Sequence, residues 1–131
     1  MTHKVGNYVV AVGHSAMSST VSASQAVAIG SNAGQQVGRS KNATFTTMVG
    51  DSAGQYATGS ANTFIGGNAG KGGTTSAPYS SGRYNVAVGA YALFGFTTGE
   101  SNIAMGYGSL QSTTSGIGNI AIGTYSGDAI T

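Results

Sequence analysis

The sequence predicts an all-β solenoid of about seven short coils, and three observations lead to that fold class. One phrase recurs along the chain, as "NVAVGAYAL" at 85–93, "NIAMGYGSL" at 102–110 and "NIAIGTYSG" at 119–127. Glycine supplies 23 of the 131 residues, and no segment shows an apolar stripe with the 3.6-residue period of a helix. The short runs before the repeated glycines instead alternate with a period of two, as β-strands do.

Seven copies of the repeat follow from the glycine that ends each apolar run, and they make residues 1–131 a single repeat domain. Successive glycines are 17, 20, 16, 23, 17 and 17 residues apart, a length typical of stacked coils that each contribute one rung. The longer intervals are interpreted as loop insertions, the largest of which is 71–84. The anchor glycines are Gly13, Gly30, Gly50, Gly66, Gly89, Gly106 and Gly123.

Each copy predicts a strand in which larger aliphatic residues stand one and three places before the glycine. We expect these side chains to form the core of the coil. The alanines between them are apolar where a solvent-facing residue is normally polar, so we expect a second chain to approach on that side. The strand-core candidates are Val86, Val88, Ile103, Met105, Ile120 and Ile122, and the inter-chain contact candidates are Ala87, Ala104 and Ala121.

A tight corner and a polar ladder are predicted in the same repeat. The third residue after each anchor glycine is always small, and the fourth is glycine, Met or Leu, which is typical of a corner where backbones approach closely. Asparagine stands four places before the glycine in the last four copies. Stacked about 4.8 Å apart, asparagines hydrogen-bond to one another and to turn backbone. The predicted ladder is Asn62, Asn85, Asn102 and Asn119.

The composition argues against several function classes. Only 6% of the residues are charged, and the five basic residues are scattered singly, so nucleic acid is not an expected partner. No apolar run approaches the roughly 20 residues of a membrane span, and no insertion into a membrane is expected. The three carboxylates, Asp51, Glu100 and Asp128, belong to different rungs, whereas a glycosidase needs a close pair. We therefore expect no enzyme activity, no cofactor and no metal.

Aromatic residues around the largest insertion are the candidates for contact with a receptor. Exposed aromatic rings serve as platforms for sugars or for protein partners. Packing between rungs or between chains explains the same residues, and both interpretations stay open. The receptor-contact candidates are Tyr79, Tyr84, Tyr91, Phe94 and Phe96.

The pattern "NxAIGxxA", with its variants "NVAVGAYA", "NIAMGYGS" and "NIAIGTYS", resembles the head repeat of trimeric autotransporter adhesins and similar repeats of bacteriophage tail fibres. The resemblance covers nearly the whole chain. It implies a left-handed β-roll in which three chains associate, intertwined or side by side, with the aliphatic pair inside its own coil and the alanines near the trimer contacts. The chain shows no stalk heptads, barrel or export signal, which favours the phage-like form.

From these observations we expect a structural fibre or adhesin protein, a homotrimer that presents loops for attachment to a host surface. Its expected location is the virion, as a tail or surface fibre, with the extracellular surface of a cell as the alternative. The receptor is expected to be a surface glycan or protein. A self-assembling extracellular filament or matrix protein is the alternative function, with rods that associate end to end. An ice-binding solenoid is less favoured because no threonine row recurs at one fixed place.

Overall fold

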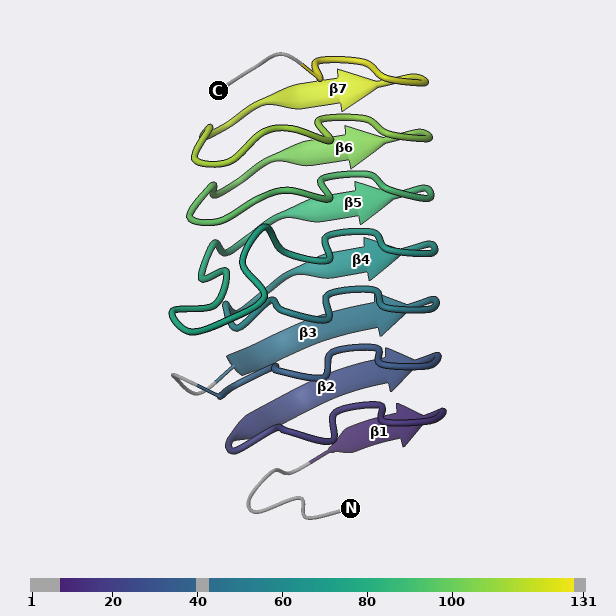
Figure 1. Cartoon of the computed structure of the whole chain (residues 1–131), viewed down its shortest axis with the longest axis vertical. Helices are drawn as coiled ribbons and strands as arrows, with labels where there is room; N and C mark the ends of the chain where they lie inside the picture. The colour runs from purple at the N-terminus through teal and green to yellow at the C-terminus, as the bar shows by residue number, and fades with distance from the viewer. Residues whose placement is uncertain (1–7, 40–42, 129–131) are drawn as a thin grey trace.

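The computed structural model describes residues 8–39 and 43–128, and they form one continuous stack of coils (Figure 1). Seven parallel strands pair in sequence order into one sheet, and no helix occurs in the described part of the chain, so the predicted all-β solenoid is confirmed. The strands are β1 (Val9–Val12), β2 (Ala23–Ile29), β3 (Ala43–Val49), β4 (Thr63–Ile65), β5 (Val86–Val88), β6 (Ile103–Met105) and β7 (Ile120–Ile122).

Equivalent positions of successive repeats lie side by side in the sheet. Ala104 of β6 pairs with Ala87 of β5 on one side and with Ala121 of β7 on the other. The register survives the largest insertion, because Thr63 of β4 still pairs with Val86 of β5. The insertion therefore forms a loop outside the ladder and leaves the spacing of the rungs unchanged.

Each strand ends at its anchor glycine because the backbone turns there into a conformation that side chains disfavour. The seven anchor glycines have φ between 125° and 135°. At Gly89 a Cβ would also lie 2.7 Å from the carbonyl oxygen of Gly106 in the next rung. Only glycine combines this turn with so close an approach of two backbones.

In five of the seven rungs the core is filled by one large side chain, supplied either by the middle of the strand or by the corner. In the rungs of β5 and β6 the strand contributes Ala87 or Ala104, and the corner contributes Leu93 or Leu110, all fully buried. In the rung of β4 the arrangement is reversed: Phe64 fills the interior, and a Cβ on Gly70 would lie 2.5 Å from its ring. In these five rungs the fourth residue after the anchor glycine is large where the strand residue is alanine, and it is glycine where the strand residue is large. The rungs of β2 and β7 instead combine Ala28 with Gly34 and Ala121 with Gly127.

The predicted orientation of the strands is wrong. The alanines Ala87, Ala104 and Ala121 are 0–4% exposed inside their own coil, so they do not form an inter-chain surface. The aliphatic pair faces outward instead. The coil is too narrow for two layers of aliphatic side chains, and the small residue is the one that fits inside. The outward residues that were expected in the core are Val86, Val88 and Ile103, which are partly exposed, and Met105, Ile120 and Ile122, which are 40–71% exposed.

The predicted asparagine ladder is present beside the start of the strands. The Oδ1 atom of Asn102 accepts hydrogen bonds from the backbone N–H of Asn119 and from its Nδ2, both at 3.0 Å. Asn102 in turn donates its backbone N–H to Oδ1 of Asn85 at 3.0 Å and its Nδ2 to the carbonyl of Gly116 at 2.8 Å. The backbone N–H of Asn85 donates in the same way to Oδ1 of Asn62, one rung earlier. The ladder satisfies buried backbone groups where each coil re-enters the sheet.

Candidate assembly and attachment surfaces

The outward side of the sheet carries two rows of side chains without a single charge. The rows arise because the residues one and three places before each anchor glycine share the face opposite the buried alanines. Twelve are aliphatic, and two are threonines. We call this surface the aliphatic face. Its rows are Val10, Val27, Thr47, Thr63, Val86, Ile103 and Ile120, and Val12, Ile29, Val49, Ile65, Val88, Met105 and Ile122.

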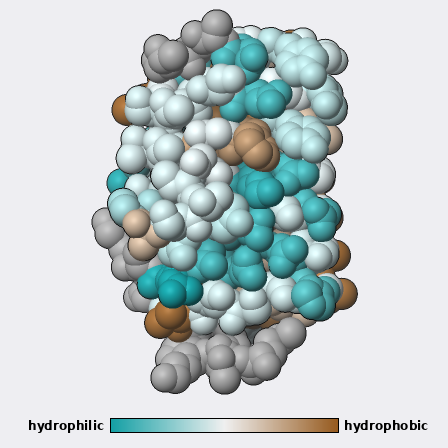
Figure 2. Space-filling view, in the orientation of Figure 1, coloured by the Kyte–Doolittle hydropathy of each residue, from teal (hydrophilic) through white to brown (hydrophobic). Residues whose placement is uncertain are grey.

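The aliphatic face is not the face seen in Figure 2. That view shows mostly neutral and hydrophilic side chains, with the few strongly hydrophobic ones lying mainly near the margins. The polar corner residues Gln35 and Gln55 lie in adjacent rungs, and the Nε2 of Gln55 donates to Oε1 of Gln35 at 3.0 Å. The molecule is therefore amphipathic, with an apolar sheet and a polar turn side.

Two of the five receptor-contact candidates are engaged within the chain. Phe96 is fully buried, and its ring lies 5.5 Å from that of Phe64, so its assignment to a receptor contact is wrong. Tyr79, in the largest insertion, stacks on Tyr56 with the ring planes 6° apart and a centroid distance of 6.3 Å. The Arg39 guanidinium also lies over the Tyr79 ring, 5.7 Å from its centroid. Tyr79 therefore fastens the insertion to earlier rungs.

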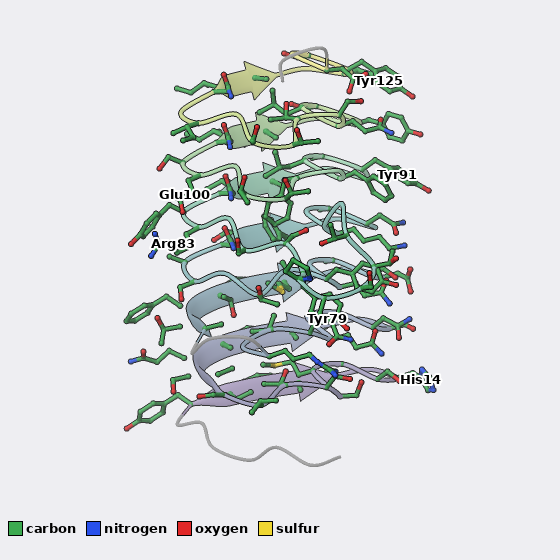
Figure 3. All side chains as sticks on the ribbon, turned by 60° about the vertical axis from the view of Figure 1, so that its left-hand side comes forward. His14, Tyr79, Arg83, Tyr91, Glu100 and Tyr125 are labelled. Carbon is green, nitrogen blue, oxygen red and sulfur yellow. The ribbon has the colours of Figure 1, made fainter. Side chains whose placement is uncertain are left out.

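The other three candidates, Tyr84, Tyr91 and Phe94, remain accessible. Tyr84 is 57% exposed beside Arg83, whose Nε donates to Oε1 of Glu100 at 3.2 Å. The Tyr91 ring contacts Phe94 at 5.6 Å, and the Lys71 ammonium lies 5.8 Å from the Phe94 centroid. Figure 3 shows Arg83 and Glu100 on one margin of the stack and Tyr91 on the opposite margin. The structure therefore does not gather the candidates into one site.

A file of tyrosines follows the margin on which Tyr91 lies. The ring of Tyr107 packs edge-on against Tyr91 at 5.8 Å and against Tyr125 at 5.4 Å. A hydrogen bond with the Tyr107 side chain, followed by desolvation and the nearby charge of Asp128, raises the pKa of the Tyr125 hydroxyl. These contacts fix the rings as a rigid strip along the last three rungs.

Within residues 8–39 and 43–128 each of the three carboxylates is engaged with a different partner. Glu100 is paired with Arg83, Asp51 accepts a hydrogen bond from the Ser52 hydroxyl at 3.1 Å, and Asp128 accepts one from the backbone N–H of Ser112 at 2.9 Å. In that part of the chain no three His, Cys, Asp or Glu side chains converge to hold a metal ion. The same residues contain no helix long and apolar enough to cross a bilayer.

Comparisons with protein-family models, with curated proteins and with solved structures found no significant match.

Sequence reasoning missed two groups of surface residues. The aliphatic face was assigned to the interior, although its lack of charge was visible in the sequence. Tyr8 and Phe45, which are 83% and 64% exposed, were not singled out. Both stand five places before an anchor glycine, as Tyr84 does. This fixed spacing is the sequence signal from which their exposure could have been predicted.

Proposed function

We propose that this chain is a structural segment of a homotrimeric fibre, of the kind found in phage tail fibres and trimeric adhesins, which presents loops for attachment to a host surface. The observation that carries the proposal is the aliphatic face, an uncharged strip along the outward side of a rigid parallel sheet. Parallel sheets are normally covered on both sides. Here the turns of the chain cover one side only, and two further copies would cover the other.

The apolar side chains supply a substantial part of the free energy that association needs. Seven of them are at least 40% exposed: Val10, Val12, Ile29, Ile65, Met105, Ile120 and Ile122. Burying each contributes about 1 kcal/mol when scaled from full burial of such a side chain. The sum of several kcal/mol per chain offsets part of the cost of association, and preorganisation of the rigid sheet keeps that cost low.

A trimer with this face at its centre places the polar turn side outward. The tip of the largest insertion, residues 75–78, is exposed there and is repeated three times around the fibre. Three weak contacts with a surface glycan or protein add up to useful avidity. The left-handed roll and the location on a virion belong to the same proposal and follow from the resemblance of the repeats to those fibres.

The test is the solution mass by light scattering over a range of concentrations, for the parent chain and two charge variants. We expect a constant mass of three chains for the parent. Ile65→Asp places a charge at the middle of the aliphatic face and is expected to give folded monomers. Thr75→Asp adds the same charge at the exposed insertion tip and should leave the trimer intact.

Other masses would lead to different conclusions. A parent chain that is monomeric throughout would overturn the fibre. A mass that grows steadily with concentration would favour the end-to-end filament. If the trimer forms, immobilised host-surface glycans and proteins can be screened with it, and the loss of attachment in variants of residues 75–78 would support the attachment role.

A further inference from the structure

The sheet has two margins that differ in the placement of their large side chains. The upstream margin consists of the residue five places before each anchor glycine, and all seven have φ between 52° and 71°, which turns each side chain away from the coil. The downstream margin consists of the two residues after each anchor glycine. Figure 3 shows that the margins are opposite: His14, Tyr91 and Tyr125 project on one side, and Arg83 and Glu100, which precede upstream-margin residues, project on the other.

The upstream margin carries aromatic side chains in three of its first five rungs and only small residues in its last two. Aromatic rings of Tyr8, Phe45 and Tyr84 project in the rungs of β1, β3 and β5. The last two rungs carry only Ser101 and Gly118 at the same place. The complete margin is Tyr8, Gln25, Phe45, Ala61, Tyr84, Ser101 and Gly118.

The downstream margin has the opposite distribution. Its first four rungs carry small or polar side chains, and its last three carry the tyrosine strip. Tyr107 and Tyr125 are about half exposed, although they contact each other. The complete margin is His14 and Ser15, Ser31 and Asn32, Asp51 and Ser52, Gly67 and Asn68, Ala90 and Tyr91, Tyr107 and Gly108, and Thr124 and Tyr125.

We propose that the two margins are the matching halves of a seam between neighbouring copies of this chain. The inference rests on the proposed assembly around the aliphatic face. A rotation axis parallel to the stack places the end of each strand beside the start of the neighbour's strand, so the downstream margin of one copy meets the upstream margin of the next. Such a head-to-tail contact closes into a ring.

The heights of the two margins decide which residues meet. The chain climbs one rung of about 4.8 Å per coil, so a downstream margin faces the upstream margin of the same rung and of the next. Tyr91 and Tyr107 then lie beside the small residues Ser101 and Gly118 of the neighbour. Conversely, the bulky Phe45 and Tyr84 lie beside Asn32 and Asn68. Large side chains meet small ones only when each downstream margin lies against the neighbour's next rung, because the pairing of equal rungs would place Tyr91 against Tyr84. This difference fixes the axial register of the copies.

The seam changes the assignment of two receptor-contact candidates. Tyr84 and Tyr91 stand on opposite margins and are buried between copies in the assembled fibre. Receptor contact is then left to the turn side, where Phe94 and the insertion tip lie.

Cross-linking between introduced cysteines tests the seam, because the chain contains no cysteine of its own. Ala90→Cys lies on the downstream margin and Ser101→Cys on the upstream margin of the next rung, and both changes are small. Within one chain the two sites are separated by the width of the sheet, roughly 20 Å. A bis-maleimide with a reach of roughly half that distance therefore joins them only between chains.

The double variant is expected to convert from monomer to covalent trimer on a denaturing gel, and each single variant is expected to stay monomeric. A trimer by light scattering that gives no covalent product in the double variant would overturn the seam and leave the proposed function standing. Covalent dimers from Ser101→Cys alone would overturn it as well, because the same margin would then meet itself. A covalent dimer as the largest product of the double variant would support the seam and overturn the trimer. A monomeric mass by light scattering would overturn both the seam and the proposed function.

Discussion

The close approach of rungs at the anchor glycines makes a prediction that can be tested with three alanine variants. In Gly66→Ala the new Cβ would lie 2.7 Å from the carbonyl carbon of Gly89 and 2.8 Å from its oxygen. Both atoms belong to backbone in the next rung, so the clash is relieved only if the rungs separate. Gly66 also has a φ of 131°, a conformation that alanine disfavours.

The two effects have comparable size and can be separated. Backbone strain contributes about 1–3 kcal/mol, and forcing an extra methyl group into packed surroundings contributes about 1–3 kcal/mol more. Gly123 has nearly the same φ, 125°, but its nearest foreign atom would be the Ser126 Cβ at 3.8 Å, so Gly123→Ala reports strain alone. A Cβ on Gly67 would meet nothing within 4 Å, and Gly67→Ala is expected to change stability by less than about 0.5 kcal/mol.

Urea unfolding followed by circular dichroism measures all three variants, at one protein concentration because the proposed assembly would raise apparent stability. We expect Gly66→Ala to be destabilised by about 4 kcal/mol and Gly123→Ala by about half of that. Equal losses in the two variants would refute the argument, because the contact between rungs would then contribute nothing. A loss in Gly67→Ala as large as in Gly66→Ala would refute it too.

Three further predictions concern the ladder, the core and the tyrosine strip. Asn102→Ala should lower the free energy of unfolding by about 3 kcal/mol because it leaves buried partners unsatisfied. Asn32→Ala, on the downstream margin, should lower it by only about 1 kcal/mol, because alanine disfavours the φ of 55° there; equal urea midpoints would contradict this. Phe96→Ala should cost about 3–5 kcal/mol of stability, seen as a lower melting temperature, and an unchanged melt would contradict its burial. Tyr107→Phe removes the main cause of the raised pKa of Tyr125, so an absorbance titration should show that hydroxyl ionising at lower pH than in the parent. In the parent the raised pKa favours the folded state below the usual tyrosine pKa, and this contribution is lost as pH rises through the folded-state value.

The number of rungs and the position of each strand could be predicted because glycine marks the end of every strand. The asparagine ladder followed from the same periodicity. The orientation of the strands could not be predicted from this periodicity. A period of two assigns alternate residues to two faces of the sheet but does not say which face lies inside the coil. The larger side chains were placed inside, as in an ordinary sheet. In this narrow coil the decisive signal was the exchange of volume between strand and corner, in which Met48 and Phe64 coincide with Gly54 and Gly70.

The contacts between aromatic side chains could not be predicted from the sequence, for a different reason. The stack of Tyr56 and Tyr79 depends on the path of a long insertion, which the repeat does not specify. The burial of Phe96 likewise depends on a second ring, Phe64, supplied by another rung. The outward projection of Tyr8 and Phe45 follows from a positive φ at residues where that conformation is uncommon.

The exchange of volume between strand and corner makes the rungs of β5 and β6 closely equivalent units. Each carries a large corner residue, a ladder asparagine and an anchor glycine, and both use the same pair of Ala and Leu. Duplicating residues 90–106 would therefore insert a complete coil and lengthen the rod by about 4.8 Å. Length in such a stack is set by copying a 17-residue unit, so the rod can be lengthened during evolution without any redesign of its core.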